Sequence, residues 1–205
     1  MCSRQGPVTV RDVSYTAQRA QQQSAERPED RPVPHAGGVS EDEFRAAMAR
    51  LAAGVVLLAA HDPEDEPDGA DVGMTATAFM SVSLEPPLVL ASVRTGSRMA
   101  ELLERQPLWA ASLLTEGQRQ SAGRFAMKGR LSDRLLFREL PHTRGAASGA
   151  PLVDGALAAV ECRTERSVRA GDHTLFIGGV LATTLAHEDS AGPLTYYRGH
   201  YRFLR

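Results

Sequence analysis

The chain has 205 residues, which suits one domain with enough length to bury a hydrophobic core. Its 23 Lys and Arg residues against 25 Asp and Glu residues give a formal charge of −2. The overall charge therefore points to neither nucleic acid nor a membrane surface as a partner. The apolar run at 55–60 is far too short to span a bilayer, and no secretory signal is visible, so we expect a cytoplasmic protein.

Neither the cysteines nor the histidines have the spacing of a metal site. Cys2 and Cys162 lie far apart, and the six histidines are scattered along the chain. We therefore expect no bound metal.

The first 38 residues are rich in Gln, Arg, Glu, Ser and Pro and contain few bulky apolar side chains. Such a segment cannot offset its ordering entropy by burial, so we expect residues 1–38 to be a disordered extension and residues 39–205 to form the domain. The domain is expected to begin with a short amphipathic helix, because residues 40–43 fit a capping box and Phe44, Met48 and Leu51 share one stripe.

A central stretch at 73–93 predicts two strands joined by a corner. In its first half, hydroxyl-bearing side chains alternate with apolar ones, which gives one polar and one apolar face. Pro86 and Pro87 cannot donate hydrogen bonds to a sheet, so the first strand should end near Glu85 and a second, apolar strand should cover 88–93.

The loop after this second strand combines the groups that bind phosphate. Arg94 and Arg98 supply charge, Thr95 and Ser97 supply hydroxyls, and the backbone around Gly96 supplies N–H donors. The favoured interpretation on spacing alone is nevertheless a buried hairpin with a solvated turn.

The remaining elements are mostly strands. Strands are expected at 108–114, 157–168, 174–185 and 194–204, and a helix at 117–126. Trp109 either flanks a ligand or belongs to the core. Residues 127–150 are expected to be irregular and basic, and to form either a lid over a ligand or a connection.

The sequence GMTATAFMSVSLEPPLVLASV at 73–93 resembles the signature of the flavin-reductase-like family of FMN-binding split barrels. Further similar segments follow in the same order, namely QRQSAGRFA at 118–126, GAPL at 149–152, GDHTLFIG at 171–178 and PLTYYRGHYRFL at 193–204. Together they cover residues 42–205, and four ordered motifs are far more specific than any one of them.

The resemblance implies a mainly β fold, an antiparallel Greek-key FMN-binding split barrel with a few short flanking helices. It also implies an NAD(P)H-dependent flavin reductase, which transfers hydride from NADH or NADPH to FMN or FAD. Reduced flavin would then reach a partner monooxygenase by diffusion. Members of the family are homodimers, so the resemblance implies a homodimer here.

The resemblance also implies a set of site residues. The backbone at 75–78 and the Thr77 hydroxyl would bind the polar edge of the flavin, and small side chains there would let the ring approach. His173 would be the catalytic residue on the nicotinamide side, whereas without the resemblance a histidine that caps the Asp172 turn is the preferred interpretation. The full set is Thr75, Ala76, Thr77, Ala78, Ser92, Val93, Arg94, Thr95, Ser97, Arg98, Phe125, Ala126, His173, Tyr196 and Arg198.

Two positions depart from the family pattern. Ala78 stands where Ser is frequent, and Ser112 stands where Asn is frequent, so a polar contact is in doubt at each. Phe125 could instead pack its helix onto the barrel, and Arg198 could pair with surface acids.

Other functions stay open on the sequence. They are a flavin-binding carrier without reductase activity, a split-barrel oxidase of the pyridoxamine-phosphate type, and a structural barrel without ligand. No Gly-x-Gly-x-x-Gly motif opens a strand–helix unit, so a nicotinamide cofactor would bind without a Rossmann domain. The choices between NADH and NADPH, and between FMN and FAD, are not determined.

Overall fold

The computed structural model describes residues 38–65, 67, 69–127, 129, 132–186 and 191–204. The expected disordered extension at 1–38 lies outside these residues, apart from Gly38. No helix within the described ranges is long and apolar enough to cross a membrane.

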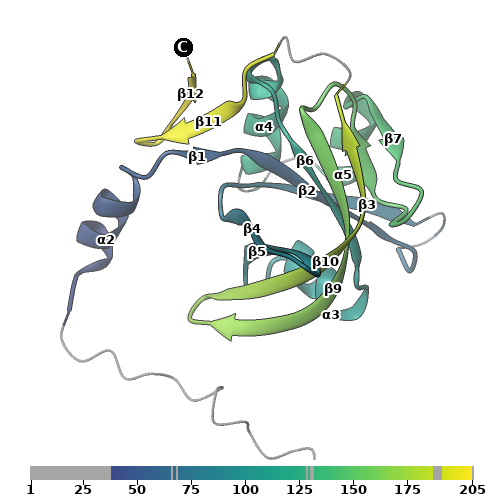
Figure 1. Ribbon diagram of the computed structural model, residues 1–205, viewed down its shortest axis with the longest axis horizontal. Helices are drawn as coiled ribbons and strands as arrows, with labels where there is room; N and C mark the ends of the chain where they lie inside the picture. The colour runs from purple at the N-terminus through teal and green to yellow at the C-terminus, as the bar shows by residue number, and fades with distance from the viewer. Residues whose placement is uncertain are drawn as a thin grey trace, which may run out of the picture. The chain divides into compact units, whose positions relative to one another are not determined.

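An antiparallel sheet of seven strands dominates the domain (Figure 1). Its spatial order is β3-β2-β6-β9-β10-β5-β4. The bounds are β2 Val56–Asp62, β3 Ala70–Ala76, β4 Phe79–Leu84, β5 Pro87–Arg94, β6 Leu108–Leu113, β9 Ala158–Ala170 and β10 His173–Leu185. The expected antiparallel β architecture with few helices is thus confirmed, and the strands expected at 157–168 and 174–185 are present with small differences at their ends.

The single strand expected in the first half of the central stretch is interrupted, so that β3 and β4 are two separate strands. These two strands are neighbours in sequence but lie at opposite edges of the sheet, and Thr77 and Ala78 between them belong to neither. The sheet curls so that β3 at one edge contacts β5, which lies beside the other edge. The Ser92 N–H of β5 donates to the Ala78 carbonyl at 2.9 Å, which extends the pairing of β4 with β5. Alternation of side chains predicted one continuous strand because it carries no information about which neighbour each half pairs with.

The segment 194–204 is also two strands rather than one. β11 (Leu194–Tyr197) and β12 (His200–Phe203) form a hairpin that pairs through β11 with β1 (Ala53–Gly54). Arg198 and Gly199 make the turn with φ of 51° and 77°, the left-handed values that tight hairpin turns need. The sequence expectation missed this turn because arginine is an unusual residue at positive φ.

β2 is buried on both faces and separates two hydrophobic clusters. Val56, Leu58 and Ala60 face the barrel interior, whereas the alternate residues Val55, Leu57 and Ala59 face the helices outside. The interior cluster includes Trp109, which is fully buried and donates from Nε1 to Thr164 Oγ1 at 3.0 Å. Trp109 is therefore a core residue.

Helices close the barrel from two sides. The apolar face of α3 (Arg98–Arg105) packs into the interior cluster through Met99, Leu102 and Leu103. The outer cluster is covered by α4 (Arg119–Ala126), which follows the 3₁₀ turn η2 (Glu116–Gln118), and by α5 (Asp133–Glu139). The amphipathic α2 (Glu41–Met48) begins with the expected Ser40 capping box and has no buried residue.

Residues 127–150 are more regular than expected. They include α5 and β7 (His142–Arg144), which pairs with β8 (Pro151–Val153). Leu136 and Phe137 of α5 are buried, and the Phe137 ring meets Phe125 edge-on at 5.0 Å between centroids. These contacts come from residues far away in the sequence, so the local pattern did not indicate a helix there.

Candidate functional site

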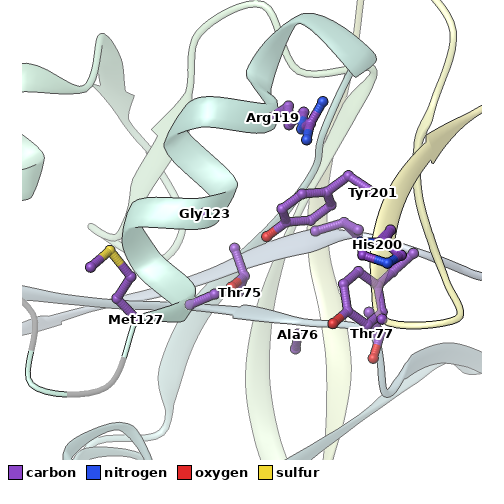
Figure 2. A pocket seen from close by; sticks show the side chains of 12 residues that line it. Thr75, Ala76, Thr77, Arg119, Gly123, Met127, His200 and Tyr201 are labelled. Atoms are coloured by element: carbon purple, nitrogen blue, oxygen red, sulfur yellow. The ribbon is translucent and has the colours of Figure 1, made fainter. Parts of the chain in front are cut away.

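A cavity of about 440 Å³ opens beside the break between β3 and β4 (Figure 2). One wall is α4, and the opposite wall is the β11–β12 hairpin. Its lining residues are Val55, Thr75, Ala76, Thr77, Arg119, Gly123, Ala126, Met127, Tyr196, Gly199, His200 and Tyr201. This volume lies within the range of small-molecule sites, roughly 300–1,000 Å³.

The strand break offers backbone donors at the cavity. Among the described residues, neither Thr77 N–H nor Ala78 N–H donates to another protein group. Both residues are exposed, and Ala76 and Ala78 have only a methyl side chain. A flat heterocycle with carbonyl and ring-nitrogen acceptors along one edge fits such an arrangement, because the ring can approach the main chain closely.

The helical wall leaves space for a ring system. Gly123 lines the cavity, and a Cβ atom built on it would meet nothing within 4 Å. Thr75 is less available, because its hydroxyl lies 3.4 Å from the Ala122 carbonyl of α4. The cavity is therefore open where the backbone donors lie and where α4 carries glycine.

Two tyrosines form the hairpin wall. The rings of Tyr196 and Tyr201 meet edge-on with centroids 5.5 Å apart. Burial raises the pKa of Tyr201 above its usual value, the neighbouring Tyr196 adds to this, and the positive charge of Arg119 acts in the opposite direction. The Tyr201 hydroxyl thus stays protonated at neutral pH and can donate a hydrogen bond.

The expected phosphate loop is largely engaged in its own structure. Val93 is fully buried, so only its backbone could face a ligand. The Ser97 hydroxyl caps α3 by accepting from Ala100 N–H at 3.3 Å, and Thr95 Oγ1 lies 2.9 Å from Thr174 Oγ1.

The two arginines of this loop differ in their surroundings. Arg98 is paired with Asp65 at 2.6 Å and with Asp133 at 3.7 Å, and it does not line the cavity. Arg94 is exposed and makes no ion pair within the described part of the chain. Arg94 is therefore the available cation of the predicted pair.

His173 begins β10 directly opposite Arg94 of β5. Its Nδ1 lies 2.8 Å from Asp172 Oδ1, and this hydrogen bond and the imidazole charge hold the pKa of the Asp172 carboxyl below its usual range. The carboxylate orients the ring, and the side chain stays about 42% exposed. His173 lies outside the cavity lining, next to the loop at 94–98.

The contacts of three further residues, Phe125, Arg198 and Ser112, show which role each can have. Phe125 is buried against Phe137 in the outer cluster and does not line the cavity, although its neighbour Ala126 does. The Arg198 guanidinium lies 5.4 Å from the centroid of the Tyr197 ring, at the hairpin turn. The buried Ser112 hydroxyl accepts from Val153 N–H at 3.0 Å, so it joins β6 to β8.

The structure brings together five of the expected residues in the cavity, namely Thr75, Ala76, Thr77, Ala126 and Tyr196. The loop residues and His173 form a separate group. Sequence reasoning did not select Arg119, Gly123, Met127, His200 or Tyr201 as site residues, although all of them line the cavity. All of these except Met127 lie inside the quoted motifs, but no local signal shows which of their residues face the cavity.

Comparisons with known proteins agree on one family. The model of the flavin reductase like domain matches residues 48–205. The reductase component of 4-hydroxyphenylacetate 3-monooxygenase from Thermus thermophilus is 37% identical over 164 residues, which cover 80% of this chain and 97% of the relative. An NADH-dependent flavin reductase from a Rhodococcus species is 38% identical over 161 residues, covering 78% and 85% of the two chains.

A solved structure is similar as well. An NADH:FAD oxidoreductase from Streptomyces globisporus, in complex with NAD and FAD fragments, superimposes with a TM-score of 0.72 at 32% identity. The match covers 83% of this chain and 98% of the other.

Proposed function

Because the chain belongs to the flavin reductase like domain family, we propose that it is an NAD(P)H:flavin oxidoreductase acting on FMN or FAD. The observation that carries this function is that the Thr77 and Ala78 N–H groups have no protein acceptor among the described residues and lie at the strand break beside an open cavity. When bound, the flavin supplies the acceptor of a hydride from the nicotinamide.

The residues of this chain bind and orient the flavin and the nicotinamide dinucleotide. The Thr77 and Ala78 N–H groups donate to the polar edge of the flavin, where negative charge develops during reduction, and preorganised donors of this kind stabilise such charge. Tyr196 and Tyr201 exclude water from one side of the cavity. Arg94 and the loop at 92–97 bind the phosphate, and His173, oriented by Asp172, binds the nicotinamide dinucleotide.

A partner monooxygenase receives the reduced flavin by diffusion. This proposal is supported by the relative whose name makes it the reductase component of a monooxygenase. A cytoplasmic location agrees with a supply of reduced nicotinamide.

We propose a homodimer on the basis of an unpaired apolar edge. In the described part of the chain β4 pairs with β5 alone, and its Met80, Val82 and Leu84 side chains are 58%, 49% and 92% exposed. An edge strand with this composition is a template for pairing with another chain. We expect sedimentation to give twice the monomer mass, and Leu84→Glu to shift it toward the monomer.

The reductase function is tested by the loss of reduced-nicotinamide absorbance in air, with NADH or NADPH crossed with FMN, FAD and riboflavin. We expect rapid oxidation with a preferred pair. If no pair is oxidised while FMN raises the melting temperature, the protein is a flavin carrier, since a ligand that binds only the folded state stabilises it.

A further inference from the structure

A group of basic side chains lies at the other end of the cavity from Met127. Arg119 is the first residue of α4, and His200 and Arg202 belong to β12. All three are exposed, and none makes an ion pair with an acid in the described ranges. Figure 2 shows Arg119 at the start of α4, at the end of the cavity away from Met127, with Tyr201 and His200 on the hairpin opposite.

This group also lines a second hollow, of about 490 Å³, together with Tyr201 and Phe203. Arg119, His200 and Tyr201 line both hollows, so the second is an extension of the first. Phe203 is 48% exposed and presents an aromatic ring there. The extension therefore combines free positive charge with an aromatic surface.

The charge of Arg119 reaches the cavity wall, because it lowers the pKa of Tyr201 against the effect of burial. Arg119 is also separate from the phosphate loop. Arg119 lines both hollows, whereas Arg94 and Arg98 of that loop line neither.

Two guanidinium groups and an imidazole without acidic partners suit a phosphate anion, because arginine binds phosphate oxygens through paired charged hydrogen bonds. Besides the flavin monophosphate, the ligands of the reaction contain one further phosphate group. It is the diphosphate that joins adenosine to the rest of NAD(P)H and of FAD. An aromatic ring beside the cations gives its adenine a surface to stack on.

We propose that Arg119, His200 and Arg202 bind the diphosphate of a dinucleotide and that Phe203 contacts its adenine. This subsite rests on the proposed reductase function and extends it. The ligand is the adenylyl half of either the nicotinamide dinucleotide or FAD.

The test uses the full chain with Arg119→Gln and Arg202→Gln combined. Titration calorimetry gives the Kd values of ADP-ribose, FAD and FMN, and steady-state oxidation gives the KM of NADH. ADP-ribose carries the adenylyl diphosphate without a nicotinamide. Arg124→Gln is the matched control, because Arg124 lies on the same helix but is paired with Glu139 at 2.5 Å and does not line the cavity.

We expect the double variant to weaken ADP-ribose about tenfold, as for the loss of charged hydrogen bonds, with FMN within twofold of the wild type. If the source is NAD(P)H, the KM of NADH rises and FAD binds as before. If the source is FAD, FAD weakens and the KM of NADH stays unchanged. The control should alter none of these constants.

Two outcomes overturn the subsite. One is that ADP-ribose, FAD and NADH all keep their wild-type constants. The other is that FMN weakens as much as the dinucleotides, which would indicate a general effect of charge on the flavin. Because the titrations do not depend on turnover, they give an answer even if the wild-type protein fails to oxidise NADH, so the two proposals can fail separately.

Discussion

The loop at 92–98 and the start of α4 both carry arginines, but their cations have different surroundings. In the loop, Arg98 is held by Asp65 and Asp133. At the start of α4, Arg119 has no acidic partner in the described chain and lines the cavity. A cation that is available to a ligand is therefore recognised by the absence of a protein counter-charge more than by its place in a motif.

Arg94 makes no ion pair within the described residues either, although its charge helps to lower the pKa of the Asp172 carboxyl, and Arg105 belongs with Arg98. Arg105 of α3 pairs with the buried Asp62 at 2.6 Å and with Glu64 at 3.0 Å. Paired arginines should therefore affect stability, and unpaired ones should affect binding.

The largest effect is expected from a substitution that fills the cavity. Gly123→Leu should place a side chain in the cavity and weaken FMN by more than about 100-fold, since the ligand cannot displace a side chain fixed on a helix. The melting temperature without ligand should not fall, because leucine favours a helix more than glycine does. Gln120→Leu, on the same helix but outside the cavity lining, is the control for titration of FMN by fluorescence. Unchanged FMN affinity in Gly123→Leu would mean that flavin binds elsewhere.

Substituting the two loop arginines one at a time should give the next largest effect. Arg94→Ala should weaken FMN about tenfold or more, as expected for a charged hydrogen bond to phosphate. Arg98→Ala should leave FMN affinity near the wild-type value and lower the melting temperature, because it leaves Asp133, which is 5% exposed, without this partner. The reverse result would show that Arg98 gives up its acids when flavin binds, and the distinction between paired and unpaired cations would fail.

His173→Ala should raise the KM for NADH several-fold and change the FMN Kd little. The ring lies beside Arg94, outside the cavity, and its orientation depends on Asp172. Asp172→Asn should reproduce part of the effect, because an amide orients the imidazole less strongly than a carboxylate. Loss of FMN binding with unchanged nicotinamide kinetics would place His173 on the flavin instead.

The smallest effect concerns stability and its pH dependence. The hydrogen bond from Arg105 holds the pKa of Asp62 below its usual range. A lowered folded-state pKa stabilises the protein above the unfolded value, about 3.9, and this contribution is lost as the pH falls through the folded-state pKa. Arg105→Gln should therefore lower the melting temperature by about 3 °C at neutral pH, and the difference from the wild type should shrink below about pH 4. A constant difference at all pH values would exclude Asp62 as its origin.

Local patterns predicted much of the fold. The alternation in β9 and β10, the prolines before β5 and the Ser40 cap each specify a local structure that the domain retains. The break at Thr77–Ala78 and the turn at Arg198–Gly199 were missed. The break depends on which distant strands β3 and β4 pair with, and neither Thr77 nor Ala78 is a typical turn former. The turn was missed although Gly199 is a typical turn residue, because its partner Arg198 is unusual at positive φ.

The site was predictable in part for the same reason. Thr75 to Thr77 lie in one continuous motif, so a resemblance can carry them as a group. Arg119 and His200 come together only because α4 and the last hairpin form opposite walls of the cavity, some 80 residues apart in sequence. Phe125 lies in a motif, yet helical rotation turns its side chain into the core while Ala126 faces the cavity.

The sheet of β1, β11 and β12 bears on how the protein is made. It joins β1, the first strand of the barrel domain, to β11 and β12, which follow the other described strands in the sequence and carry both tyrosines of the cavity wall. Domains start to fold during synthesis, beginning with the residues that leave the ribosome first. The barrel strands can pair on the ribosome, but the aromatic wall forms only after β12 has emerged. We therefore expect flavin to bind after the barrel strands have paired, and the supply of flavin in the cell should not limit the yield of folded chains.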